Sequence, residues 1–180
     1  MLVLNISGGD LFNEETEEFI PVKSHTIQLE HSLVSISKWE SKWCKSFLSS
    51  GEKTYEETVD YIKCMTVTPN VDPNLYQYLT QEHIKKVNDY ISAPMTATTF
   101  SETKGKGSSR SIITSEVIYY QMVAYNIPFE CEKWHLNRLL TLIKVCSIKN
   151  EPPKKMGKRE LMSRNAALNA ARRQRLNSKG

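Results

Sequence analysis

The sequence has 180 residues, of which 39% are hydrophobic, and this is enough for one folded domain with an additional arm. No apolar run approaches the about 20 residues that span a bilayer, and the mean hydropathy of −0.45 is typical of a soluble protein. We therefore expect that this protein is not an integral membrane protein and that it has no membrane partner.

The cysteines and the N-terminal segment bear on the compartment. The first ten residues lack the basic region of a secretory signal peptide. The four cysteines show no CxxC spacing, so reduced thiols in a cytosolic setting are the simplest expectation.

Charge is distributed unevenly along the chain, although the net charge is only +4. Residues 1–99 contain eight Lys or Arg against fourteen Asp or Glu, a net charge of −6. Residues 100–180 contain sixteen against six, a net charge of +10. Asymmetry of this kind indicates an interaction arm or an acidic partner.

A β pattern is predicted only in residues 1–33. Apolar and polar residues alternate in residues 2–5 and again in residues 26–31, which is the pattern of half-buried strands. The sequence Ser-Gly-Gly-Asp at residues 7–10 predicts a turn. We expect a short hairpin or meander that packs against helices, because so few strands are marginally stable alone.

The next hundred residues have helical periodicity. Residues 36–48 place Ile36, Trp39, Trp43 and Phe47 on one face, and this helix is expected to stop at Gly51. Further predicted elements are a helix with a capping box at Thr54, a short turn opened by Asp72-Pro73, and a helix that begins at Thr80 and ends before Pro94. Residues 94–110 show no periodicity and are predicted to be a loop.

The richest apolar segment, residues 112–149, predicts a helical hairpin that the rest of the fold packs against. Asn126 suits a left-handed helix cap and Pro128 suits the first turn of the second helix. Apolar residues surround the first helix, so it is either central or shared with a partner. We expect one row to face the core (Val117, Tyr120 and Ala124) and a second row to remain for a partner (Ile118, Met122 and Tyr125).

The fold class expected from these patterns is mainly α. Residues 1–150 would form the domain with the N-terminal β hairpin or meander, and residues 151–180 a basic arm, helical when bound and disordered when free. Helix propensity is high over residues 159–176. The candidate contacts in the arm are its cations: Lys154, Lys155, Lys158, Arg159, Arg164, Arg172, Arg173 and Arg175.

No pattern recommends catalysis, a metal or a cofactor. Cys131 and His135 share a helix face, but no nearby pair supplies the two further ligands that zinc needs. Residues 105–109 contain Gly, Lys and Ser without the spacing of a phosphate-binding loop. No serine or cysteine matches a nucleophile signature. We therefore predict a protein that is not an enzyme.

Four blocks, together about half of the chain, resemble the tail assembly chaperone of long-tailed bacteriophages. They are LEHSLVSISKWESKWCKSFL (29–48), YIKCMT (61–66), YYQMVAYNIPFECEKWHLNRLLTLIKVCSIKN (119–150) and PPKKMGKRELMSRNAALNAARR (152–173). The resemblance implies a mostly helical, non-enzymatic protein that binds the tape-measure protein before tail tube subunits polymerise around it. It also implies location in the host cytoplasm and absence from the mature virion. The tail tube protein and a second copy of the chain are further candidate partners.

A nucleic-acid-binding regulator is the alternative function. The arm, with ten Lys or Arg against two acids from residue 149 onward, could contact phosphates. No aromatic residue follows Trp134, however, so the arm offers no platform for base stacking. The arm could equally bind an acidic protein, bind the acidic half of another copy, or be a solvated tail.

Overall fold

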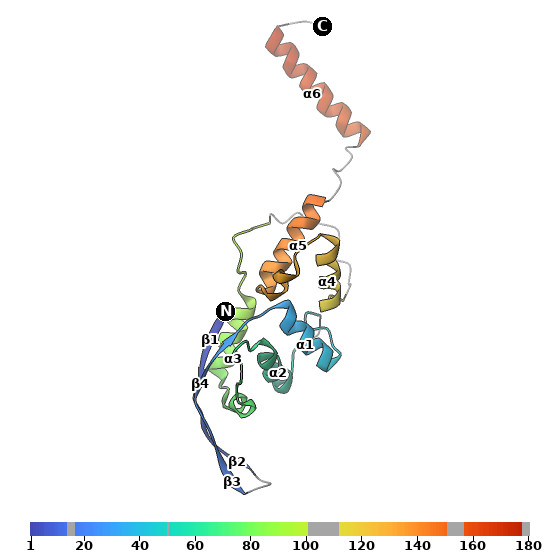
Figure 1. Ribbon diagram of the computed structural model, residues 1–180. Coiled ribbons are helices and arrows are strands. Elements are labelled where there is room, and N and C mark those ends of the chain that lie inside the picture. The colour runs from blue at the N-terminus through green and yellow to red at the C-terminus, as the bar shows by residue number, and fades with distance from the viewer. Residues whose placement is uncertain (14–16, 50, 101–111, 151–156, 178–180) are drawn as a thin grey trace. The chain divides into compact units, whose positions relative to one another are not determined.

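The computed structural model describes residues 1–13, 17–49, 51–100, 112–150 and 157–177 (Figure 1). The chain forms two compact units, Met1–Ser147 and Ile148–Gly180, and each is described here by itself. Helices make up 57% of the described residues, and an antiparallel β hairpin occupies the N-terminus. The predicted mainly α class with an N-terminal hairpin is confirmed.

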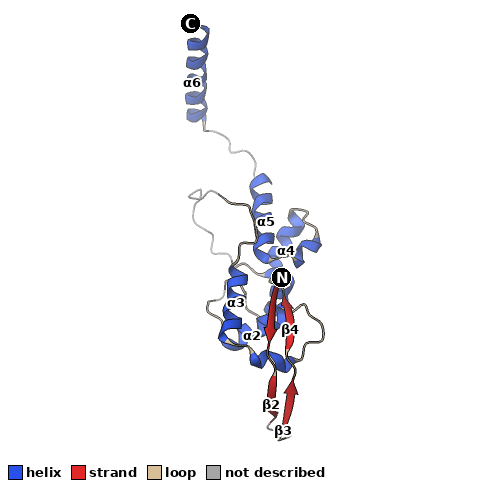
Figure 2. Cartoon of the chain, turned by 90° about the vertical axis from the view of Figure 1, so that its left-hand side faces the viewer, coloured by secondary structure: helices blue, strands red, loops and turns tan. Residues whose placement is uncertain are grey.

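The strands form one long antiparallel ribbon of two successive pairs, β1 with β4 and β2 with β3 (Figure 2). Their bounds are β1 Leu2–Ile6, β2 Gly9–Asn13, β3 Glu18–Val22 and β4 His25–Leu29. The predicted turn at residues 7–10 is wrong, because the first strand continues there into β2. Gly8 instead allows the neighbouring strand to approach closely, because a Cβ on Gly8 would lie 1.8 Å from the carbonyl oxygen of Val22.

The β1–β4 end of the ribbon is part of the core. Leu4 pairs with Ile27, and both side chains are buried together with Ile6 and Leu29. The chain after α2 runs along the outer edge of β4, where the Val67 amide donates to the Gln28 carbonyl at 2.8 Å. The alternation in residues 2–5 and 26–31 therefore predicted the buried side of both strands correctly.

Four helices follow the ribbon and cover this buried end. They are α1 Leu33–Trp43, α2 Tyr55–Met65, the 3-10 helix η1 Pro73–Tyr78 and α3 Gln81–Ser92. The capping box at Thr54 and the start at Thr80 are confirmed. Helix α1 ends earlier than predicted, since Cys44 adopts a left-handed conformation with φ of 51°. Phe47 is nevertheless buried, now from the turn that follows.

The central segment forms α4 Ser115–Ala124, the 3-10 helix η2 Phe129–Lys133 and α5 Leu136–Asn150. Asn126 has a φ of 53°, as its predicted role in a left-handed cap requires. Pro128 precedes η2 rather than opening the second long helix, which begins only at Leu136. There the Leu136 amide donates to the His31 carbonyl at 2.7 Å and so joins α5 to the end of the ribbon.

The second unit contains α6, Lys158–Leu176. All of its described side chains are exposed to solvent. Lys154 and Lys155, two of the predicted contacts in the arm, lie outside the described residues. Within the described ranges, each helix is too short or too polar to cross a membrane.

Candidate functional site

Helix α4 is apolar on both sides, and the structure buries the side that we expected to remain free. Ile118 and Met122 are 0% exposed and lie in the core. Tyr120 and Val123 are 73% and 59% exposed, and Val117 is exposed as well. The predicted assignment of the two rows is therefore wrong, and Ile118 and Met122 form no binding surface in this fold.

A buried carboxylate on α1 holds the start of α4. The Ser115 amide, at the start of α4, donates to Glu40 Oε2 at 2.7 Å, and the Phe47 amide donates to Glu40 Oε1 at 2.7 Å. Thr114, the residue before α4, makes no side-chain capping hydrogen bond of its own. Glu40 thus replaces the local cap, because a carboxylate is a strong acceptor for the free amides of a helix start.

Two further hydrogen bonds hold α4 against the segment that follows it. The Tyr119 hydroxyl donates to Glu132 Oε2 at 2.9 Å, which links α4 to η2. Burial, followed by this hydrogen bond, raises the pKa of Tyr119 to about 12. The Ile127 amide donates to the Met122 carbonyl at 2.8 Å and closes the end of the helix. Contacts at both ends hold the orientation of α4.

The α4 outer face, defined as Val117, Tyr120, Val123 and Ala124, is the candidate site. These residues recur at three- and four-residue spacing, and all are exposed. Glu116 is the only charged residue of α4. Exposed apolar side chains gathered on one helix face are suited to a partner helix that buries its own apolar stripe.

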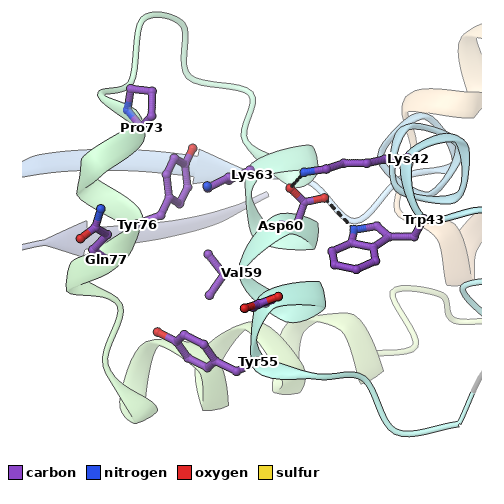
Figure 3. Close-up of a pocket in the computed structure, with 10 residues that line it drawn as sticks. Lys42, Trp43, Tyr55, Val59, Asp60, Lys63, Pro73, Tyr76 and Gln77 are labelled. Atoms are coloured by element: carbon purple, nitrogen blue, oxygen red, sulfur yellow. Dashed lines mark hydrogen bonds and ion pairs between the residues drawn. The ribbon is translucent and has the colours of Figure 1, made fainter.

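A groove between the end of α1, helix α2 and η1 is a second candidate surface (Figure 3). Its volume is about 420 Å³, and its lining residues are Lys42, Trp43, Tyr55, Glu56, Val59, Asp60, Lys63, Pro73, Tyr76 and Gln77. Figure 3 shows Trp43 and Tyr76 on opposite sides of the groove, with Val59 between them. Asp60 accepts hydrogen bonds from the Trp43 indole at 2.9 Å and from Lys42. Because that carboxylate is already paired, the groove is suited to an aromatic or aliphatic side chain.

The other predicted contacts have mixed outcomes. Tyr125 is half-buried and packs against the core of unit 1. In unit 2, the described cations of α6 are all exposed, namely Lys158, Arg159, Arg164, Arg172, Arg173 and Arg175.

Sequence reasoning did not anticipate the buried polar cluster below β4. His31 Nδ1 lies 2.5 Å from the Tyr61 hydroxyl, and the rings of His31 and His135 lie 5.1 Å apart. Burial, and secondarily the charge of His135, lowers the pKa of His31 to about 3. Among the described residues, no group of three potential metal ligands gathers there.

No protein-family model matches this chain, and no curated protein or solved structure matches it either.

Proposed function

We propose that this protein is a non-enzymatic assembly chaperone of a long-tailed bacteriophage. In this proposal it binds the tape-measure protein and keeps it soluble in the host cytoplasm until tail tube subunits enclose it. The tail tube protein is a second partner at that stage, and the chaperone then leaves the assembly. The observation that carries the proposal is the exposed α4 outer face.

The chemistry of the α4 outer face supports a helical partner. A tape-measure protein is a long amphipathic helical chain that exposes apolar surface until it is packaged. Val117, Tyr120 and Val123 offer an apolar face of matching periodicity on a helix that unit 1 holds in place. Helix-against-helix packing of this kind needs neither a cofactor nor a catalytic group.

The expected affinity is also appropriate for a chaperone. Burying a large apolar side chain stabilises a complex by about 1.5–3 kcal/mol, before the costs of association are subtracted. A few such residues support a dissociation constant in roughly the micromolar to millimolar range. Weak contacts repeated along one long partner would keep it soluble, and tube subunits could still displace them.

Co-expression with the tape-measure protein of the same phage tests the proposal. The intact chain should keep that protein in the soluble fraction, and the Tyr120→Ser, Val123→Ser double variant should lose most of this effect. Val67→Ser is the matched control for Val123→Ser, because Val67 is 55% exposed and Val123 59%. The proposal fails if the tape-measure protein precipitates equally with and without this chain.

A nucleic-acid-binding regulator remains the second candidate, because α6 exposes six described cations along a helix. Such a protein should bind DNA or RNA with a steep dependence on salt, since each phosphate contact releases counterions. Arg172→Glu with Arg173→Glu should then abolish retention on a DNA column at low salt. Absence of retention by the intact chain would eliminate this function.

A further inference from the structure

The β2–β3 end of the ribbon exposes an aromatic pair. Phe12 and Phe19 are directly opposite in the strand register, their ring centroids lie 5.2 Å apart, and Phe19 is 69% exposed. Asp10 and Pro21, the pair two residues further along, point to the same side, because side chains alternate along a strand. We call these four exposed residues the ribbon face. Figures 1 and 2 show this end of the ribbon extending away from the helices of unit 1.

The ribbon face lies in the most acidic part of the chain. No lysine or arginine precedes Lys23 in the sequence, whereas Asp10, Glu17 and Glu18 are exposed along the described ribbon. None of these three carboxylates takes part in an ion pair among the described residues. The ribbon face therefore presents an aromatic pair beside the Asp10 carboxylate, and Glu17 and Glu18 add exposed negative charge at the same end of the ribbon.

Helix α6 has the complementary character. Leu161 and Leu168 lie seven residues, or about 10 Å, apart on one side of the helix. Arg172 and Arg175 fall on the same side at helical spacing. We call these four exposed residues the arm face. Every described side chain of α6 is exposed, whereas helices in proteins gain most of their stability by packing an apolar face, so a partner would stabilise this helix.

We propose that the protein associates with itself head to tail, the arm face of one copy docking on the ribbon face of a second copy. Leucines would cover the aromatic pair, and arginines would neutralise the carboxylates. The two surfaces carry opposite charge, and both expose apolar side chains. Joining unlike surfaces produces a heterologous contact, which forms rings or open chains rather than a closed pair.

A second copy is a better occupant than the chain's own arm. Figures 1 and 2 show that, within unit 1, the C-terminal part of α5 and the β2–β3 ribbon lie at opposite ends. The chain thus leaves unit 1 at the end remote from the ribbon face. In a head-to-tail row, the ribbon face of the next copy would lie at the end of unit 1 from which the arm extends. This inference is independent of tape-measure binding.

Sedimentation velocity of the full-length, nuclease-treated protein tests this association. The apparent mass should rise with protein concentration at 50 mM NaCl and fall toward the monomer at 1 M NaCl, where screening shortens the Debye length to about 3 Å. A ribbon variant, Asp10→Arg with Glu17→Arg, and an arm variant, Arg172→Glu with Arg175→Glu, should each weaken self-association at least tenfold. The matched control, Asp89→Arg with Glu52→Arg, reverses exposed carboxylates elsewhere in unit 1 and should change association little.

Mixing the two variants gives the decisive result. The new arginines of the ribbon variant then face the new glutamates of the arm variant, and the unchanged ribbon face of the arm variant meets the unchanged arm face of the ribbon variant. Mixed complexes should therefore form at concentrations where each variant alone is monomeric. Unchanged thermal unfolding of each variant excludes misfolding. The proposal is overturned if the intact protein is monomeric at all concentrations, as docking of its own arm would make it. It is also overturned if mixing restores nothing, or if nuclease treatment removes the association and so reveals nucleic acid as the partner.

Discussion

The two ends of the β ribbon have the same construction and opposite surroundings. Both are antiparallel pairs of five-residue strands. At the β1–β4 end, Leu4 and Ile27 are buried in the core, whereas at the β2–β3 end Phe12 and Phe19 are exposed. Strand pairing alone therefore does not decide burial. Phe12 and Phe19 contribute little to the core, which makes them available to another molecule.

The difference arises from what covers each end. Helices α2 and α3 and the chain after α2 cover β1 and β4, and the Glu30 amide donates to the Met65 carbonyl at 2.9 Å. At the junction of the two ends, Gly9 allows close packing against η1, since a Cβ there would lie 2.8 Å from the Tyr78 ring. Beyond that contact Leu11 still packs partly against the core, whereas Phe12 and Phe19 are exposed.

Truncating an isoleucine at each end should give the largest contrast. Ile27→Ala removes a side chain that is 0% exposed and should lower the free energy of unfolding by about 3 kcal/mol, through lost burial and a residual cavity. Ile20→Ala at the open end, where Ile20 is 36% exposed, is the matched control and should cost less than about 1 kcal/mol. Urea unfolding of both variants measures the difference, and equal losses would show that both ends are packed alike.

Acid should weaken the packed end through His31, which follows β4. The folded-state pKa of His31 is lowered to about 3, below the ordinary value of 6.5, because the imidazole is buried. The unfolded chain therefore binds a proton that the folded protein excludes. The folded protein is most stable, with respect to His31, above pH 6.5. As the pH falls toward 3, protonation of His31 in the unfolded chain lowers the free energy of unfolding by at most about 1.4 kcal/mol per pH unit.

Urea unfolding between pH 7 and pH 5 measures this loss, which should reach about 2 kcal/mol. A His31→Asn variant should be less stable at pH 7 and should lose less stability on acidification. Glu57 and Asp60 contribute little to the pH dependence between pH 7 and pH 5. Their hydrogen bonds, with Lys45 for Glu57 and with Lys42 for Asp60, lower the pKa of each carboxyl from its ordinary value. Identical pH slopes for the two proteins would contradict the assignment to His31.

The first turn of α1, immediately after the packed end, should show a smaller effect. Ser32 Oγ accepts from the Ser35 amide at 3.3 Å, and Ser35 Oγ accepts from the Ser32 amide at 3.0 Å. Ser32→Ala should therefore lower the free energy of unfolding by about 1 kcal/mol. Ser41→Ala, on the exposed side of the same helix, should have almost no effect or stabilise slightly. A similar response at both positions would exclude a specific capping contribution.

The smallest effect on stability is expected at the open end itself. Phe19→Ser removes one member of the Phe12–Phe19 pair and should cost about 0.5 kcal/mol. Val3→Ser, on the exposed side of β1, is the control. Sedimentation should nevertheless show that Phe19→Ser, unlike Val3→Ser, weakens self-association. A loss of several kcal/mol on unfolding would instead mean that Phe19 is part of the packed core.

Local features of the fold were predictable from neighbouring residues. Thr54 and Thr80 cap their helices because a hydroxyl reaches the amide three residues on, which depends on no distant contact. Asn126 is left-handed for an equally local reason. The alternation around Ile27 predicted its burial, since a strand with one polar side has only one side to bury.

Features that depend on distant residues were not predictable in this way. Two glycines suggested a turn at residues 7–10, but they accommodate Val22 and Tyr78, neither of which is near them in the sequence. The predicted length of α1 failed similarly. Phe47 continues the apolar spacing of that helix, yet its amide donates to Glu40 and the chain has already turned at Cys44.

For this protein, the sequence by itself determined the class of fold, most helix starts, the buried side of the packed strands and the separation of acidic and basic charge. Only the tertiary structure decided which side of α4 faces solvent. Periodicity cannot choose between faces when both are apolar. In the fold, Ile118 and Met122 are buried in the core, Tyr120 is exposed, and the Ser115 amide donates to Glu40 across 75 residues of sequence.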